Sequence, residues 1–103
     1  MAIMLRPGTR LFSAVCTTEL ITVKAPAEPI ELTIGGAPPV MSADERTAGT
    51  PSEGHDRGAA LGKRYVDATE LVELLCTKGG DGAPAVAGEL MHVKGAKALP
   101  ASD

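Results

Sequence analysis

The two cysteines are the residues best able to carry chemistry in this sequence. Cys16 and Cys76 each end an apolar stretch and each precede a threonine. A pair of thiolates supplies half of a tetrahedral zinc site, and His92, His55 or Glu19 would complete it. Cys16, Cys76 and His92 are therefore the candidate ligands of a zinc or iron ion.

The spacing of the cysteines argues against that metal site. Neither Cys16 nor Cys76 belongs to a Cys-x-x-Cys pair, the short-range arrangement that makes zinc sites recognisable. The plainer interpretation is two reduced cysteines that pack as small apolar side chains. A disulfide is the third alternative, and disulfides are rare in the cytoplasm.

Nucleophilic catalysis has candidates but no signature. The side chains that could take part are scattered along the chain: Cys16, Cys76, His55, His92, Asp56 and Asp67. No Gly-x-Ser-x-Gly motif, phosphate-binding loop or dinucleotide-binding glycine pattern links them. Glycines 79, 80 and 82 fit a hairpin turn better than a phosphate cradle, because Pro84 and a strand follow them. We therefore predict no catalytic residue and no cofactor-binding residue.

Most of the segments that would position these residues have the pattern of strands. Residues 10–24 are rich in β-branched and apolar side chains and predict one long strand or a bulged pair. Ile30, Leu32 and Ile34 alternate with polar residues, which is the period of a strand with one buried face. Glycines and prolines at 35–39 then end this strand.

Residues 61–78 have two interpretations. A short helix over 69–78, capped at Asp67 or Thr69, is one of them. The other is a hairpin with strands at 62–66 and 71–77 and a turn at 67–70, which places Val72, Leu74 and Cys76 on one face. We favour the hairpin, because a helix of about ten residues is marginal alone and the other ordered segments are predicted strands.

The remaining segments complete a mainly β fold. Short strands are predicted at 84–87 and 90–94, with a further edge at 96–99 and a tail at 100–103. Residues 42–60 are polar without apolar periodicity, which predicts a long, flexible loop. The sequence thus predicts one small β domain over residues 1–103, an antiparallel barrel or sandwich of about six or seven short strands.

Composition narrows the classes of partner and the location. Of 103 residues, 10 are basic and 13 acidic, and the only aromatic side chains are Phe12 and Tyr65. The basic side chains are scattered along the chain and aromatic side chains are nearly absent. Both features argue against nucleic acid as a binding partner. No apolar run is long enough to span a bilayer, and the run after Arg10 is too short for a secretion signal. We expect a cytoplasmic protein, and its alanine and glycine content suggests a bacterial source.

No motif in the sequence indicates a function, so the functional hypotheses rest on the size and the predicted fold class of the domain. The leading hypothesis is a small binding domain, an accessory, assembly or regulatory subunit of a larger protein, with a protein partner or a homo-oligomer as its assembly. The first alternative is a small metal-binding protein that uses Cys16 and Cys76 with a histidine or carboxylate. The second alternative is a cysteine-dependent enzyme.

Overall fold

The computed structural model describes residues 2–47 and 49–94, and these residues form strands and no α-helix. The elements are β1 (Arg10–Phe12), β2 (Glu19–Lys24), β3 (Leu32–Ile34), the 3-10 turn η1 (Ala43–Glu45), β4 (Arg64–Val66), β5 (Glu73–Lys78), β6 (Pro84–Val86), β7 (Glu89–Leu90) and β8 (His92–Val93). The prediction of a mainly β fold is confirmed.

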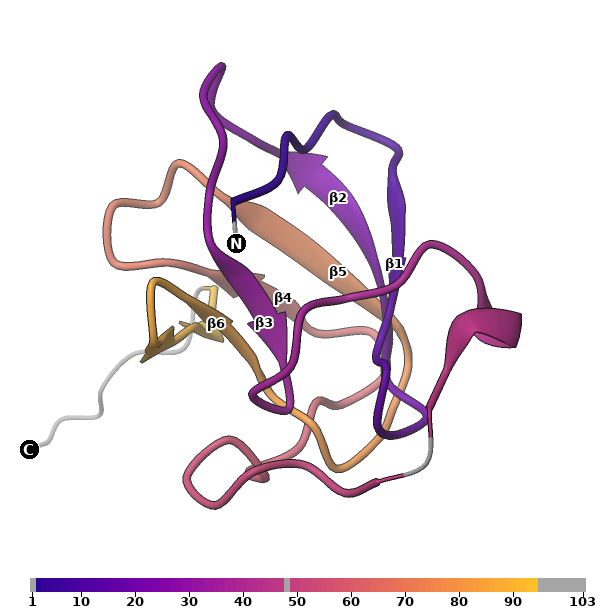
Figure 1. The fold of residues 1–103 in the computed structure, drawn as a ribbon. Coiled ribbons are helices and arrows are strands. Elements are labelled where there is room, and N and C mark those ends of the chain that lie inside the picture. The colour runs from indigo at the N-terminus through magenta and orange to yellow at the C-terminus, as the bar shows by residue number, and fades with distance from the viewer. Residues whose placement is uncertain (1, 48, 95–103) are drawn as a thin grey trace, which may run out of the picture.

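The strands form two antiparallel sheets. The larger sheet has the order β1-β2-β5-β4-β8, and the smaller has the order β3-β6-β7. Strands β2 and β5, with six residues each, form the centre of the larger sheet and run side by side in Figure 1. Because β2 and β5 are about 50 residues apart in the sequence, the largest pairing in the fold is a long-range one.

The core lies between the two sheets. Leu11, Leu20 and Leu74 project into it from the larger sheet, and Leu32 and Ile34 project into it from the smaller one. Each of these five side chains is at most 1% exposed. Burial of a leucine or isoleucine contributes about 1.5–3 kcal/mol, so these residues decide which face of each strand points inward.

A third segment joins the edges of the two sheets. The Phe12 N–H donates to the Val40 carbonyl oxygen at 2.9 Å, and the Val40 N–H donates to the Phe12 carbonyl oxygen at 2.8 Å. Val40 lies in the segment that follows β3, the edge strand of the smaller sheet, and pairs with Phe12 of β1, the edge strand of the larger sheet. This connection agrees with the barrel or sandwich that was predicted.

Residues 10–24 form two strands, β1 and β2, that pair as a hairpin. The prediction of one long strand or a bulged pair missed the loop between them, residues 13–18. The Ser13 N–H donates to the Thr18 carbonyl oxygen at 2.9 Å, which closes the loop at its base. Polar Ser13 and Thr18 are fully buried here and hold the loop, a role that the pattern of apolar residues does not reveal.

The hairpin over residues 62–77 is confirmed, and the alternative helix over 69–78 is wrong. Strand β5 occupies most of that segment, because Val72, Leu74 and Cys76 are buried with the period of a strand. The Asp67 carboxylate accepts the Val72 N–H at 3.1 Å, so the residue that would have capped a helix instead closes the turn.

Residues 42–47 and 49–60 form no strand and no helix apart from η1, and backbone hydrogen bonds tie them to the rest of the molecule. The N–H groups of Thr47, Ser52 and Ala59 donate to carbonyl oxygens of Ala14, Gly35 and Gly80 at 2.8–2.9 Å. Flexibility of the loop stays a prediction.

The strand predicted at 90–94 is divided between the sheets: β7 pairs with β6, and β8 pairs with β4. The edge predicted at 96–99 and the tail at 100–103 lie outside the described residues.

Candidate functional site

Cys16 lies in the loop between β1 and β2, where polar groups surround its sulfur. Its Sγ is 3.1 Å from Ser13 Oγ and 3.3 Å from Thr18 Oγ1, and it accepts the backbone N–H of Gly82 at 3.2 Å. The Thr18 hydroxyl donates to the Gly82 carbonyl oxygen at 3.0 Å. The Ser13 hydroxyl and the Gly82 N–H are therefore the donors best placed to stabilise a thiolate.

These surroundings lower the pKa of the Cys16 thiol below its ordinary value. Burial acts in the opposite direction and is the largest single influence, but hydrogen bonds involving Ser13, Thr18 and Gly82 together outweigh it. Cys16 is partly exposed. The thiol therefore ionises more readily than an ordinary cysteine and has access to solvent.

Arg46 fixes the loop that carries Cys16. Its guanidinium donates to the Ser13 carbonyl oxygen at 3.1 Å and pairs with the Glu19 carboxylate at 3.0 Å. It also lies 5.8 Å from the centre of the Phe12 ring. One side chain from the irregular segment thus holds both ends of the Cys16 loop.

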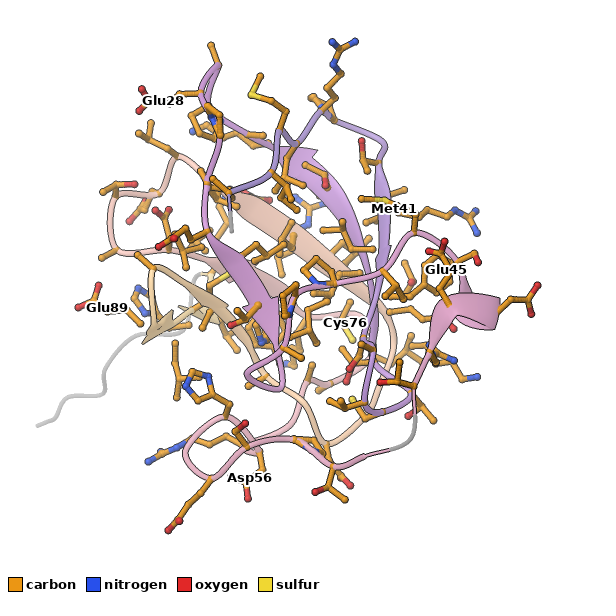
Figure 2. All side chains as sticks on the ribbon, in the orientation of Figure 1. Glu28, Met41, Glu45, Asp56, Cys76 and Glu89 are labelled. Carbon is orange, nitrogen blue, oxygen red and sulfur yellow. The ribbon has the colours of Figure 1, made fainter. Side chains whose placement is uncertain are left out.

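The other two candidate metal ligands lie on strands of the larger sheet. Cys76 is in the middle of β5, buried among core side chains, and Figure 2 shows it in the interior. Its Sγ is 3.3 Å from the Lys78 carbonyl oxygen, and burial raises its pKa. His92 is exposed on β8. Both cysteines are free thiols.

Among residues 2–47 and 49–94, no three His, Cys, Asp or Glu side chains form a group able to hold a metal ion. The candidate acids and bases are also dispersed. His55 lies in the irregular segment with a buried Nδ1 that has no hydrogen-bond partner, and Asp56 is exposed beside it. Asp67 lies in the turn between β4 and β5, where its carboxylate accepts the Val72 N–H. No hydrogen bond in the described part of the chain joins Cys16 to a histidine.

The outward face of the larger sheet carries a second feature, which we call the outer row: Arg10, Ile21, Leu75 and Arg64. Arg10 is paired with Ile21, Ile21 with Leu75, and Leu75 with Arg64, so the row crosses β1, β2, β5 and β4 in register. Residues directly opposite each other project from the same face of a sheet. The outer row therefore has two apolar residues at its centre and an arginine at each end.

The exposure of the side chains shows which way this row faces. The neighbouring row is Leu11, Leu20 and Cys76, and these side chains are buried in the core. Ile21 and Leu75 are partly exposed, and Arg10 and Arg64 are exposed. The outer row therefore faces solvent, and the described residues leave its apolar centre partly uncovered.

A buried carboxylate lies next to the outer row. Glu73 Oε2 is 3.3 Å from Arg64 Nη1, and Glu73 Oε1 is 2.8 Å from Lys94 Nζ. The Glu73 side chain is 5% exposed, whereas its two partners are about half exposed. This end of the face holds two cations for one carboxylate, and Arg10 at the other end has no ion pair in the described residues.

Reasoning from the sequence missed the outer row. Its residues come from four strands, and β2 pairs with β5 through register shifts on both sides of the Ile21–Leu75 pair. The sequence offered only a weak signal: Arg10 begins the strand predicted at 10–24, and Arg64 lies in the middle of the strand predicted at 62–66.

Comparisons with models of protein families, with curated proteins and with solved structures found no match to this chain. None of the described residues forms a helix long and apolar enough to cross a membrane.

Proposed function

We propose that this chain is a non-catalytic binding domain that serves as an accessory, assembly or regulatory subunit of a larger protein. The observation that supports the proposal best is the outward face of the larger sheet. Ile21 and Leu75 lie side by side at its centre and are only partly covered. A sheet face with an apolar centre is stabilised when another element packs on it.

Further apolar side chains lie open at other places on the surface. Leu61 is 70% exposed, and Met4, Met41 and Leu71 are each about half exposed. Single exposed apolar residues are common on protein surfaces and carry little weight. Ile21 and Leu75 differ from them because they are directly opposite each other on two paired strands.

Photocrosslinking in cells that make the protein tests this proposal. A photoreactive amino acid replaces Leu75 on the open face, and in separate variants it replaces Leu61 or Glu89, which lie elsewhere on the surface. We expect one protein partner to be linked from position 75. If no position gives a discrete product and the chain elutes from lysate as a free monomer, the binding function is wrong.

Cysteine chemistry at Cys16 is the second candidate function. The lowered pKa of its thiol and the Gly82 N–H at 3.2 Å favour it. A nucleophilic role also requires a substrate pocket and a base, and the described residues bring neither histidine into hydrogen-bond contact with Cys16. The proposal of a binding domain therefore takes precedence.

A further inference from the structure

We infer that the outer row docks an amphipathic helix of a partner protein, with an apolar stripe flanked on both sides by aspartate or glutamate. This inference rests on the proposed binding function and specifies its surface and the chemistry of the partner. Three features of the face carry it: the apolar centre, the spacing of the two arginines and the local excess of positive charge.

The apolar centre fits the stripe of a helix. Ile21 and Leu75 are directly opposite on paired strands, which places their Cβ atoms about 5 Å apart. Together they form a short ridge between β2 and β5, the two longest strands of the sheet. A helix that lies along these strands buries both side chains under one apolar stripe.

The arginines fit the flanks of the same helix. Neighbouring strands lie about 4.8 Å apart, so three strand spacings place the Arg10 and Arg64 backbones about 14 Å from each other. A helix with its side chains is about 10–12 Å wide. A helix over Ile21 and Leu75 therefore has one guanidinium on each side, and both guanidiniums can reach carboxylates.

The charge of the face selects an acidic partner. The chain has a formal net charge of −3, yet on this part of the face, among the described residues, Arg10, Arg64 and Lys94 outnumber the carboxylate of Glu73. At the edge of the face, Glu19 is neutralised by Arg46. Acidic residues such as Glu28, Asp56 and Glu89 lie at the periphery in Figure 2. The face thus has a charge opposite to that of the whole chain, which attracts an acidic helix and repels a basic one.

The test is an NMR titration of the uniformly 15N-labelled full chain with two synthetic peptides. One peptide is a helix of about 18 residues with a leucine stripe flanked by glutamate, and the other carries lysine in place of every glutamate. We expect the acidic peptide to shift the amide signals of the outer row and the basic peptide to leave them unchanged. Arg10→Glu should weaken binding about fivefold, because it replaces an attraction with a repulsion.

Arg57→Glu is the matched control, because Arg57 is exposed in the irregular segment and the substitution changes the net charge equally. Arg10 is exposed and unpaired in the described structure, so its substitution leaves the fold intact. Leu75→Thr serves as a second variant that tests the apolar centre without changing charge, and it should also weaken binding.

Four results would overturn the inference: no binding of the acidic peptide, equal binding of the basic peptide, equal weakening by Arg57→Glu, or shifts centred away from the outer row. Shifts of the outer row that depend on the concentration of the chain alone would identify a second copy as the occupant and also overturn it. Crosslinking of a partner from Leu61 but not from Leu75 would refute the docking face and leave the binding function standing.

Discussion

Ile21 lies directly opposite Leu75 on the outward face of the larger sheet, with Arg10 beyond one and Arg64 beyond the other. The same strands bury Leu20 and Leu74 on their inward face. A single pair of strands therefore supplies the centre of the core on one side and a partly uncovered apolar ridge on the other. The proposed binding function and the proposed chemistry of the partner both rest on this two-sided arrangement.

Glu73→Gln should destabilise the fold by about 1–2 kcal/mol. The substitution removes the charge from a carboxylate that is 5% exposed and bonded to Arg64 and Lys94. Arg64 and Lys94 are about half exposed, so water can solvate them when the carboxylate is removed. The loss of stability is therefore smaller than for a fully buried ion pair. Urea denaturation followed by circular dichroism measures the change. Glu89→Gln, on an exposed residue, should change stability by less than about 0.5 kcal/mol, and equal effects of the two variants would refute the role of Glu73.

Stability should fall in acid because of Glu73. The hydrogen bond from Lys94 lowers the pKa of Glu73 most, burial opposes it, and the charges of Lys94 and Arg64 lower it further. Lys24 is the backbone partner of Glu73 on β2, and its side chain is exposed. A carboxyl group with a lowered pKa in the folded state stabilises the fold above its ordinary pKa of about 4.3. This contribution is lost as the pH falls through the lower folded value.

The pKa of Asp67 is lowered as well, so it contributes in the same direction: burial raises this pKa, and bonds from Thr69, Val72 and Leu71 outweigh that effect. Thermal melting between pH 7 and pH 3 checks the prediction. The melting temperature should drop below about pH 4.3, and the drop should be smaller in Glu73→Gln. An identical pH profile in the variant would show that Glu73 does not control acid stability.

Cys16 should react with iodoacetamide at neutral pH at least about tenfold faster than Cys76. Its thiol has a lowered pKa and is partly exposed, whereas the Cys76 thiol is buried and has a raised pKa. Mass spectrometry of the alkylated peptides over time measures both rates in one sample. Ser13→Ala should slow the reaction of Cys16, because it removes a hydroxyl that stabilises the thiolate. Faster modification of Cys76 would contradict the arrangement around Cys16.

Gly82→Ala should destabilise the fold by about 2–3 kcal/mol, the upper part of the range for an overpacked site. A Cβ atom at this position would lie 2.8 Å from Cys16 Sγ and 3.1 Å from the Gly35 Cα, so the Cys16 loop would have to move. Gly88→Ala is the comparison: Gly88 has open space around it and a φ of +83°, which costs about 1 kcal/mol. Urea denaturation ranks the two variants, and an equal or smaller loss in Gly82→Ala would refute the close packing at Cys16.

The sequence predicted the parts of the fold that depend on local patterns. The alternation of Ile30, Leu32 and Ile34 gave β3, and the alternation of Val72, Leu74 and Cys76 gave the hairpin that contains β5. Leu32 and Ile34 are buried in the first segment, with Ile30 partly buried, and all three alternating residues are buried in the second. The period of two in hydrophobicity therefore reflects which face points into the core.

Long-range pairing could not be predicted in the same way. The outer row depends on the register between β2 and β5, and that register includes shifts between Glu19 and Leu20 and between Thr22 and Lys24. The Cys16 loop depends on Gly82, 66 residues further along the chain. Neither relationship leaves a periodic signal, because a bulge and a backbone N–H are not visible in residue types.

Isothermal titration calorimetry of the acidic amphipathic peptide against three chains tests the docking face most directly. The chains are the unmodified protein, Leu75→Thr and Leu71→Thr. Leu71 is 49% exposed but belongs to the turn before β5, outside the outer row. We predict that Leu75→Thr weakens binding about tenfold, the loss expected when a leucine no longer contributes its buried surface, and that Leu71→Thr leaves affinity unchanged. Equal affinities for all three chains, or a larger loss in Leu71→Thr, would contradict the assignment of the outward sheet face as the binding surface.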